Sequence, residues 1–190
     1  MPDASATGAV LRRVPYDHPD AVVLTEAAQE FYVRIYGGPD GTPIAHGEFA
    51  VPYGAFFVGY LDGEPVVMGG WRFVDARISN AGRPAEIKRM FVREDRRGLG
   101  LARWMLAALE SDAAAAGADA MILETGSPQV AAIGLYRSSG YRDVDRFGYY
   151  ADEPNALNLG KPLAPSLSGP AVAGDGYWED SAQRRQEGER

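Results

Sequence analysis

The chain has 190 residues, of which 46% are hydrophobic and 24% are charged, which is the composition of an ordinary globular domain and excludes a fully disordered chain. Lysine and arginine together number 19 against 26 aspartate and glutamate residues, and the resulting net charge of −7 disfavours a protein that binds nucleic acid by neutralising phosphates. The sequence contains no cysteine and two isolated histidines. We therefore expect no disulfide, no thiolate nucleophile and no metal site.

The ends of the sequence differ from its body in composition. No basic segment followed by an apolar stretch opens the chain, and no apolar run approaches the roughly 18 residues of a membrane span. We therefore expect a cytoplasmic protein without a membrane partner. Residues 164–190 are polar and rich in proline, glycine and serine, which predicts a disordered tail behind one domain formed by residues 1–163.

The first half of the chain predicts a strand, a helix, a loop and a hairpin in that order. Apolar residues recur at the spacing of one helical face over residues 24–35. Three prolines and little periodicity predict a loop over residues 38–53, of the kind that forms pocket walls. Asp62-Gly63 favours the positive φ angles of a tight hairpin turn. The predicted strands are residues 9–14, 55–61 and 66–74.

The second half continues to alternate strands and helices. Apolar residues at helical spacing predict a helix over residues 98–116, which Gly117 ends. Ser127-Pro128 offers an N-cap and a first-turn proline for a second helix, which reaches Ser139. The predicted strands are residues 85–92, 120–125, 141–149 and 156–161. These elements together predict an α/β (α+β) fold, a mixed and largely antiparallel sheet of about seven strands flanked by helices.

The most specific motif is Arg97-Gly98-Leu99-Gly100-Leu101-Ala102-Arg103, which joins a predicted strand to a predicted helix. Its two glycines remove side chains where the backbone enters the helix, so the first free N–H groups can point at one anion. The helix dipole and the charges of Arg96, Arg97 and Arg103 strengthen that potential, and a pyrophosphate is the natural ligand. Two glycines at a helix start are, on their own, equally compatible with simple packing. The motif is not a dinucleotide fingerprint, which would need a third glycine at Arg103.

This loop resembles the pyrophosphate loop R/Q-x-x-G-x-G/A of the GNAT superfamily of acyl-CoA-dependent N-acetyltransferases, with a complete match from Arg97 to Ala102. A second motif of that family, N-x-x-A-x-x-L-Y before a glycine and an aromatic residue, also follows in order. It reads Gln129, Ala132, Leu135, Tyr136 and then Gly140-Tyr141, so only Gln129 departs from the pattern. The resemblance spans about residues 9–163, and two ordered motifs are more specific than either one.

The resemblance implies an enzyme that moves the acetyl group of acetyl-CoA to a primary amine of a small molecule or a protein, by direct attack in a ternary complex. It implies that the glycine-containing loop, Gln129 and Tyr136 bind the cofactor. Backbone N–H groups of Met90, Phe91 and Val92 would bind the pantetheine amides, and one of them would stabilise the thioester oxyanion. A homodimer is compatible with the family. The alternative is a non-catalytic acyl-CoA-binding sensor or interaction module, whereas a nucleotide-binding oxidoreductase lacks its glycine pattern.

The chemistry needs a base for the amine and an acid for the leaving thiolate. Glu86 is the first candidate base, because it occupies the strand position at which histone-acetylating relatives carry a glutamate, and Glu124 is the second. For both residues a structural ion pair is the alternative. By analogy Tyr136 donates a proton to the thiolate, with a packing role as the alternative. Strand alternation places Glu86, Lys88, Met90 and Val92 on one face of the strand.

The acceptor pocket is expected at the end of the first helix, the loop over residues 38–53 and the last strands. Aromatic rings and carboxylates in this region suit an ammonium group. The predicted acceptor-binding residues are Tyr32, Tyr36, Trp71 and Tyr149, with Asp40, Glu48, Tyr53 and Tyr150 in the same region.

Overall fold

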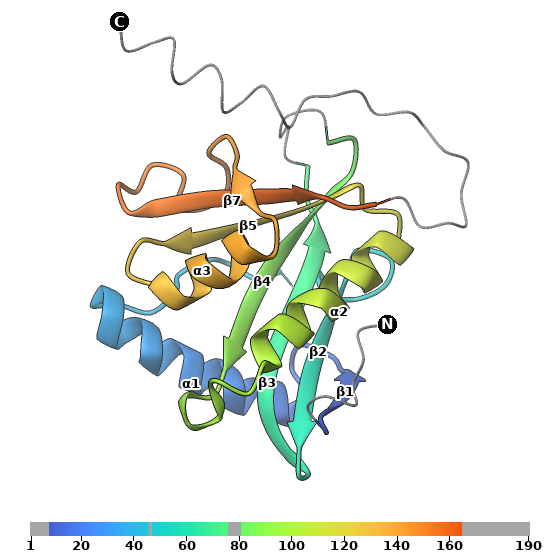
Figure 1. The fold of residues 1–190 in the computed structure, drawn as a ribbon, viewed down its shortest axis with the longest axis vertical. Helices are drawn as coiled ribbons and strands as arrows, with labels where there is room; N and C mark the ends of the chain where they lie inside the picture. Colours follow the sequence, from blue (N-terminus) through green and yellow to red (C-terminus); the bar gives the residue numbers. More distant parts are fainter. Residues whose placement is uncertain (1–7, 46, 76–80, 165–190) are drawn as a thin grey trace, which may run out of the picture.

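A mixed sheet forms the centre of the molecule. In the computed structural model, which describes residues 8–45, 47–75 and 81–164, seven strands follow the order β1-β2-β3-β4-β5-β7-β6 (Figure 1). Each neighbouring pair is antiparallel except β4 and β5, which run parallel, so the predicted fold class is confirmed. The strands are β1 (Val10–Arg13), β2 (Gly54–Leu61), β3 (Glu64–Phe73), β4 (Pro84–Val92), β5 (Ala120–Gly126), β6 (Arg142–Asp143) and β7 (Ala156–Pro162).

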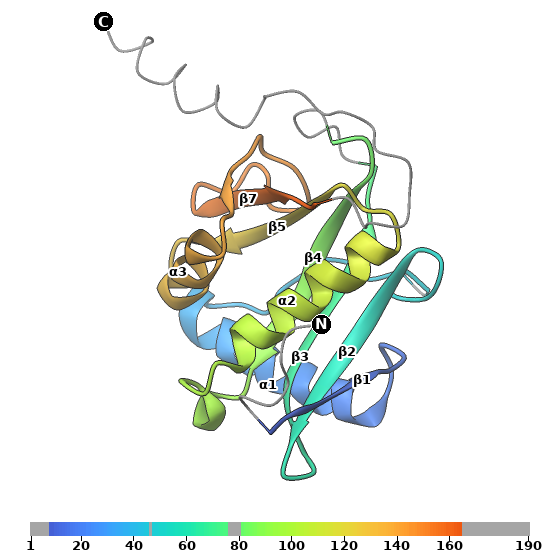
Figure 2. The ribbon, with the colours of Figure 1, turned by 45° about the vertical axis from the view of Figure 1, so that its right-hand side comes forward.

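Helices cover both faces of this sheet. The helix α1 (Pro19–Tyr36) lies on one face, and α2 (Leu101–Ala115) and α3 (Val130–Ser138) lie on the other (Figures 1 and 2). The helix α1 begins five residues before the predicted apolar pattern. The reason is a local cap, in which the His18 ring accepts the Asp20 backbone N–H at 3.2 Å and Pro19 occupies the first turn.

Two apolar clusters hold the helices on the sheet. The cluster under α2 contains Met105, Leu106 and Leu109, all at most 1% exposed. The cluster under α1 contains Leu24 and Phe56, which are also almost completely buried. Both faces of the central strands are therefore covered, and a charged side chain on these strands needs a partner inside the protein.

A bulge interrupts the pairing of β3 with β4. Met68 pairs with Phe91 and Gly70 pairs with Lys88, which leaves two residues of β4 opposite a single residue of β3. Arg89, the first residue of the bulge, has a left-handed backbone with a φ of 57°. An extra residue of this kind reverses the side-chain alternation beyond it.

The predicted common face of β4 is therefore wrong beyond the bulge. Glu86 and Lys88 share one face, as expected. Met90 and Val92, however, pack against the cluster under α2, and Phe91 packs against the cluster under α1. The alternation rule assumes an uninterrupted strand, and the bulge violates that assumption.

The parallel strands β4 and β5 pair only near their beginnings. Their register runs from Pro84 opposite Ala120 to Glu86 opposite Ile122, and beyond this point the two strands diverge (Figure 1). On its β5 side, the remainder of β4 has no neighbouring strand in the described part of the chain. The divergence leaves space between the two strands at the centre of the sheet.

Two further predicted elements differ from the structure. The strand expected over residues 141–149 is confined to β6, because only Arg142 and Asp143 pair with β7 and the chain then runs as a loop to residue 155. Ser127 does not cap α3, which begins at Val130 after Gln129, because the Ser127 hydroxyl donates to the Asn155 side chain instead. Most of the predicted tail, residues 165–190, lies outside the described residues, and no helix in the described part is long and apolar enough to cross a bilayer.

Candidate active site

A cavity of about 390 Å³ opens where β4 and β5 diverge. The end of α1, the helix α3 and two loops, over residues 38–42 and 150–156, complete its wall. Aromatic and charged side chains share this wall. The tyrosines are Tyr32, Tyr36, Tyr136 and Tyr150, and the charged residues are Asp40, Lys88, Arg89, Glu124 and Glu153.

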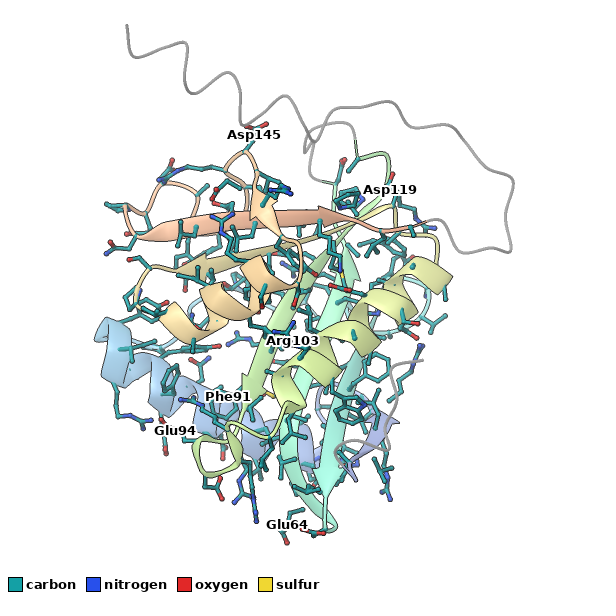
Figure 3. The ribbon with its side chains drawn as sticks, viewed as in Figure 1. Glu64, Phe91, Glu94, Arg103, Asp119 and Asp145 are labelled. Carbon is teal, nitrogen blue, oxygen red and sulfur yellow. The ribbon has the colours of Figure 1, made fainter. Side chains whose placement is uncertain are left out.

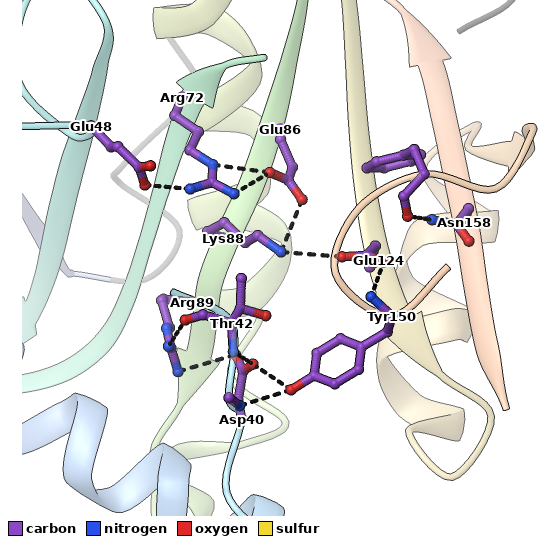
Figure 4. A network of polar contacts seen from close by, with 12 residues as sticks. Asp40, Thr42, Glu48, Arg72, Glu86, Lys88, Arg89, Glu124, Tyr150 and Asn158 are labelled. Atoms are coloured by element: carbon purple, nitrogen blue, oxygen red, sulfur yellow. Dashed lines mark hydrogen bonds and ion pairs between the residues drawn. The ribbon is translucent and has the colours of Figure 1, made fainter. Parts of the chain in front are cut away.

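A chain of alternating charges runs through the sheet to this cavity (Figure 4). Arg72 pairs with Glu48 and lies 2.9 Å from Glu86, and the Lys88 ammonium lies 2.9 Å from Glu86 and 3.3 Å from Glu124. The side chains of Glu86, Lys88 and Glu124 are at most 9% exposed. This ion chain contains three carboxylates and two cations, so it has one negative charge in excess. One end of the chain is Glu124, which lines the cavity.

The two candidate bases therefore occupy different surroundings. Glu86 lies between Arg72 and Lys88 and does not line the cavity. Its geometry is that of the structural ion pair that the sequence left as the alternative. Glu124 lines the cavity and has a cation on one side only, so its carboxylate is the one that a molecule in the cavity can reach.

A second polar cluster closes the opposite wall. Asp40 lies 3.1 Å from the Arg89 guanidinium, accepts the Thr42 backbone N–H at 2.9 Å and accepts the Tyr150 hydroxyl at 3.0 Å. The backbone N–H of Tyr150 donates to Glu124 at 3.1 Å. Tyr150 therefore links the loop after α1 to the end of the ion chain (Figure 4).

These surroundings shift the pKa values of two groups. Burial alone would raise the pKa of Asp40, but the hydrogen bonds from Thr42 and the charge of Arg89 outweigh burial and hold this pKa below its usual range. Burial, reinforced by the charge of Asp40, raises the pKa of Tyr32 to about 12. At neutral pH Asp40 is therefore an anion and Tyr32 is a neutral phenol.

The predicted residues of α3 also reach the cavity. Tyr136 is 6% exposed, and burial raises the pKa of its hydroxyl, which therefore keeps its proton at neutral pH. The Gln129 amide donates to the Tyr36 hydroxyl at 2.9 Å, so the residue that departs from the family motif joins the start of α3 to the end of α1. All three residues line the cavity.

The glycine-containing loop forms an open cradle at the start of α2. Gly98 and Gly100 have left-handed φ angles of 81° and 78°, and a Cβ added to either would meet nothing within 4 Å. The Trp104 N–H donates to the Gly100 carbonyl at 3.0 Å, so the earlier N–H groups of this turn have no helical acceptor. The first turn of α2 contains no acidic residue. This cradle, residues 98–103, fits a phosphate-bearing ligand.

Arginines surround the cradle. The Arg97 guanidinium lies 4.7 Å from the centre of the Phe31 ring, which places its charge beside the loop. Arg103 lies between α2 and α3 and donates to the hydroxyls of Ser138 and Ser139 at 2.9 and 3.2 Å (Figure 3). The start of α2 is therefore tied to the end of α3, whose Tyr136 lines the cavity.

Two predicted acceptor residues lie elsewhere. Trp71 is 2% exposed, packs in the cluster under α2 and donates its indole N–H to Asp112 at 2.8 Å, so its side chain points away from the cavity. Trp71 therefore lies on the face of the sheet that α2 covers. Tyr149 is 59% exposed and contacts Tyr150 edge to face without lining the cavity. Within the described residues, no group of three acidic or histidine side chains could hold a metal ion.

Comparison with known proteins identifies the family of the chain. The family model described as the Acetyltransferase (GNAT) family matches residues 21–141, more than half of the chain. The chain belongs to the GNAT acetyltransferase family. An "IAA acetyltransferase" of Azospirillum brasilense is 43% identical to this GNAT chain over 86 residues, which are 45% of the chain and 56% of that relative. The match therefore spans little more than half of the relative's length.

Solved structures of the family share the fold. A putative acyl-CoA N-acyltransferase from Klebsiella pneumoniae superposes with a TM-score of 0.68 at 24% identity, covering 82% of this chain and 98% of the other. A GNAT family acetyltransferase from Elizabethkingia anophelis, solved with acetyl-CoA bound, superposes with a TM-score of 0.56 at 15% identity, covering 82% and 99%. At these identities the likeness establishes the fold alone.

Removal of the Asp40 carboxylate should destabilise the protein in a pH-dependent way. Because its folded pKa is lowered, the charged form contributes stability above the unfolded pKa of about 3.9, and this contribution is lost as the pH falls through the folded value. Asp40→Asn should lower the free energy of unfolding by about 3 kcal/mol at pH 7, because Arg89 is left buried without its counter-ion. Urea unfolding at pH 7 and below pH 4 measures the difference in the free energy of unfolding between the native protein and the variant. This difference should be smaller in acid. Asp152→Asn, at an exposed position, is the control, and a pH-independent difference would contradict the role of Asp40.

Proposed function

We propose that this GNAT protein is an N-acetyltransferase that moves the acetyl group of acetyl-CoA to a primary amine by direct attack in a ternary complex. One observation supports the proposal most strongly. The divergence of β4 and β5 opens a cavity whose wall contains both a buried carboxylate, Glu124, and a buried phenol, Tyr136. These are the two kinds of group that transfer of an acyl group between an amine and a thiol requires.

Acetyl-CoA, which carries its acetyl group as an activated thioester, is the acyl donor in this proposal. The cradle of residues 98–103 supplies free backbone N–H groups for the diphosphate, and Arg97 and Arg103 add positive charge beside it. Beyond Glu86, β4 lacks a neighbouring strand on its β5 side among the described residues, which leaves backbone groups of Met90 to Val92 for the pantetheine amides. The Elizabethkingia relative is described as having acetyl-CoA bound, which agrees with this donor.

The acceptor must lose a proton before it attacks. A lysine-like amine has a pKa of about 10.4, so its neutral form costs about 4.6 kcal/mol at pH 7. Glu124, at one end of the ion chain, places a carboxylate in the cavity wall, where it attracts an ammonium group and accepts its proton. Glu86 holds Lys88 in place instead of acting on the substrate.

The leaving sulfur needs a hydrogen-bond donor inside the protein. Tyr136 remains protonated because burial raises its pKa, so it can donate to the sulfur as negative charge develops there. Its ring packs against Tyr141 with 5.6 Å between the ring centres, which holds the hydroxyl in one place. Because Tyr136 also lines the cavity, we assign it this role in addition to its packing in the core.

A side chain in the cradle should weaken the binding of acetyl-CoA. Gly100→Val should raise the dissociation constant at least about tenfold, because the added carbons occupy the space in which a phosphate must approach the N–H groups. Gly63→Val is a matched control, since Gly63 has a φ of 82°, open surroundings and a place in the distant β2–β3 turn. Isothermal calorimetry measures both variants. Equal affinities for the two would show that the diphosphate does not lie in the cradle.

Loss of the Glu124 carboxylate should reduce turnover. Glu124→Gln keeps an acceptor for the Tyr150 N–H but cannot take a proton, so kcat/KM for amines should fall about 100-fold or more. The pH profile of kcat/KM should also change. Without the carboxylate, kcat/KM should follow the fraction of the amine that is already neutral in solution and rise up to the pKa of the amine. Release of free CoA over a pH series measures both effects. A comparable loss in Glu86→Gln with none in Glu124→Gln would place the base at Glu86.

Loss of the Tyr136 hydroxyl should affect the chemical step and not binding. Tyr136→Phe should lower kcat about 100-fold or more while the dissociation constant for acetyl-CoA stays the same. Tyr141→Phe changes the neighbouring ring outside the cavity lining and controls for altered packing. A native chain that binds acetyl-CoA but acetylates nothing in a broad amine panel would instead be a non-catalytic acyl-CoA-binding module.

A further inference from the structure

A second carboxylate lies at the mouth of the cavity. Glu153 is exposed and also lines the cavity, whereas the Glu124 side chain is only 5% exposed and lies deeper. The Glu153 carboxylate has neither an ion pair nor a hydrogen-bond partner among the described residues. It differs in this respect from Asp40 and Glu124, whose carboxylates contact Arg89 and Lys88. Glu153 is therefore the acid of the cavity wall that forms no ion pair within the described residues.

The backbone around Glu153 is held in place from several directions. Its N–H donates to the Tyr150 carbonyl at 3.0 Å, and its own carbonyl accepts from the Arg146 guanidinium and the Ala156 N–H, both at 3.1 Å. The Tyr150 N–H in turn donates to Glu124 at 3.1 Å. Two successive hydrogen bonds thus connect the Glu124 carboxylate to the backbone of Glu153 through Tyr150. They constrain the distance between Glu124 and the Glu153 backbone.

The charge balance of the wall favours a cation at both depths. Lys88 is shared between Glu86 and Glu124, so Glu124 at the deep end of the cavity has only part of one cation as a partner. Arg89 and Asp40 pair with each other, and the charged residues that line the cavity are three acids and two bases, so the wall has one negative charge in excess. Arg146 does not line the cavity, and its guanidinium donates to two backbone carbonyls. A concave site of this kind concentrates the field of its unbalanced charges.

We propose that the acceptor is a primary amine that carries a second protonated amine, and that Glu153 selects it by binding this second ammonium. The inference rests on the proposed acetyl transfer. The reacting ammonium gives one proton to Glu124, its nitrogen forms a bond to the acetyl carbon as the carbon–sulfur bond breaks, and its second proton leaves with the sulfur as CoA thiol. The ammonium at Glu153 keeps its proton throughout and serves only to position the acceptor.

The test compares alkyl diamines with monoamines of equal carbon number over a series of chain lengths. In the native protein, kcat/KM should be about fivefold higher for the best diamine than for its matched monoamine, mainly through a lower KM. Glu153→Gln should lower the diamine value at least about fivefold, to nearly that of the monoamine, and change the monoamine value much less, while the affinity for acetyl-CoA stays the same. Glu153→Asp should retain most of the preference because it keeps the charge. High ionic strength should weaken the preference in the native protein.

A neighbouring acid provides the matched control. Asp152 is adjacent and exposed but does not line the cavity, so Asp152→Asn should preserve the preference for diamines. Equal use of diamines and monoamines by the native protein, or a preference that survives Glu153→Gln, would overturn the role of Glu153 and leave acetyl transfer intact. Absence of CoA release with every amine, although acetyl-CoA binds, would overturn the proposed function itself.

Discussion

The early end of the pairing between β4 and β5 is the constraint on which the site depends. A parallel pair in the middle of a sheet normally continues its ladder, but here the hydrogen-bonded register stops at Glu86 and Ile122. Lys88 bridges the gap just beyond this point, since its ammonium contacts Glu86 on β4 and Glu124 on β5. An ion pair thus connects the two strands where backbone hydrogen bonds no longer do, and the space that remains is the cavity.

Burying these charges is acceptable only because each has a partner. An isolated charge in a protein interior is costly, whereas an alternating row of charges distributes that cost over several close contacts. The row has an anion at each end, Glu48 at one and Glu124 at the other, and Glu124 lines the cavity. The same ion pairs that connect β4 and β5 where they separate therefore place a carboxylate in the cavity wall.

Features encoded within a few neighbouring residues could be predicted from the sequence, whereas features that arise from tertiary contacts could not. The cradle follows from Gly98 and Gly100 beside a helical pattern, and the structure has that geometry. The bulge at Arg89 has no comparable local signal, so the alternation rule misplaced Met90 and Val92. The orientation of Trp71 depends on which face α2 covers, and the contact of Tyr150 with Asp40 joins loops 110 residues apart. Sequence patterns therefore identified Glu124 as a candidate but could not distinguish its surroundings from those of Glu86.

The two ends of the site are supported by different parts of the molecule. The cradle belongs to α2, which Arg103 ties to the end of α3 through Ser138 and Ser139. The mouth belongs to the loop between β6 and β7, which Tyr150 ties to Asp40 and to Glu124. The contacts that hold the cradle and those that hold the mouth involve different residues. Substitutions in the loop over residues 144–155 therefore leave the contacts of the cradle intact. Under the proposed function, the donor would bind at a helix terminus and a separate loop would select the acceptor, so a fold built in this way could keep one acyl donor while the acceptor varies.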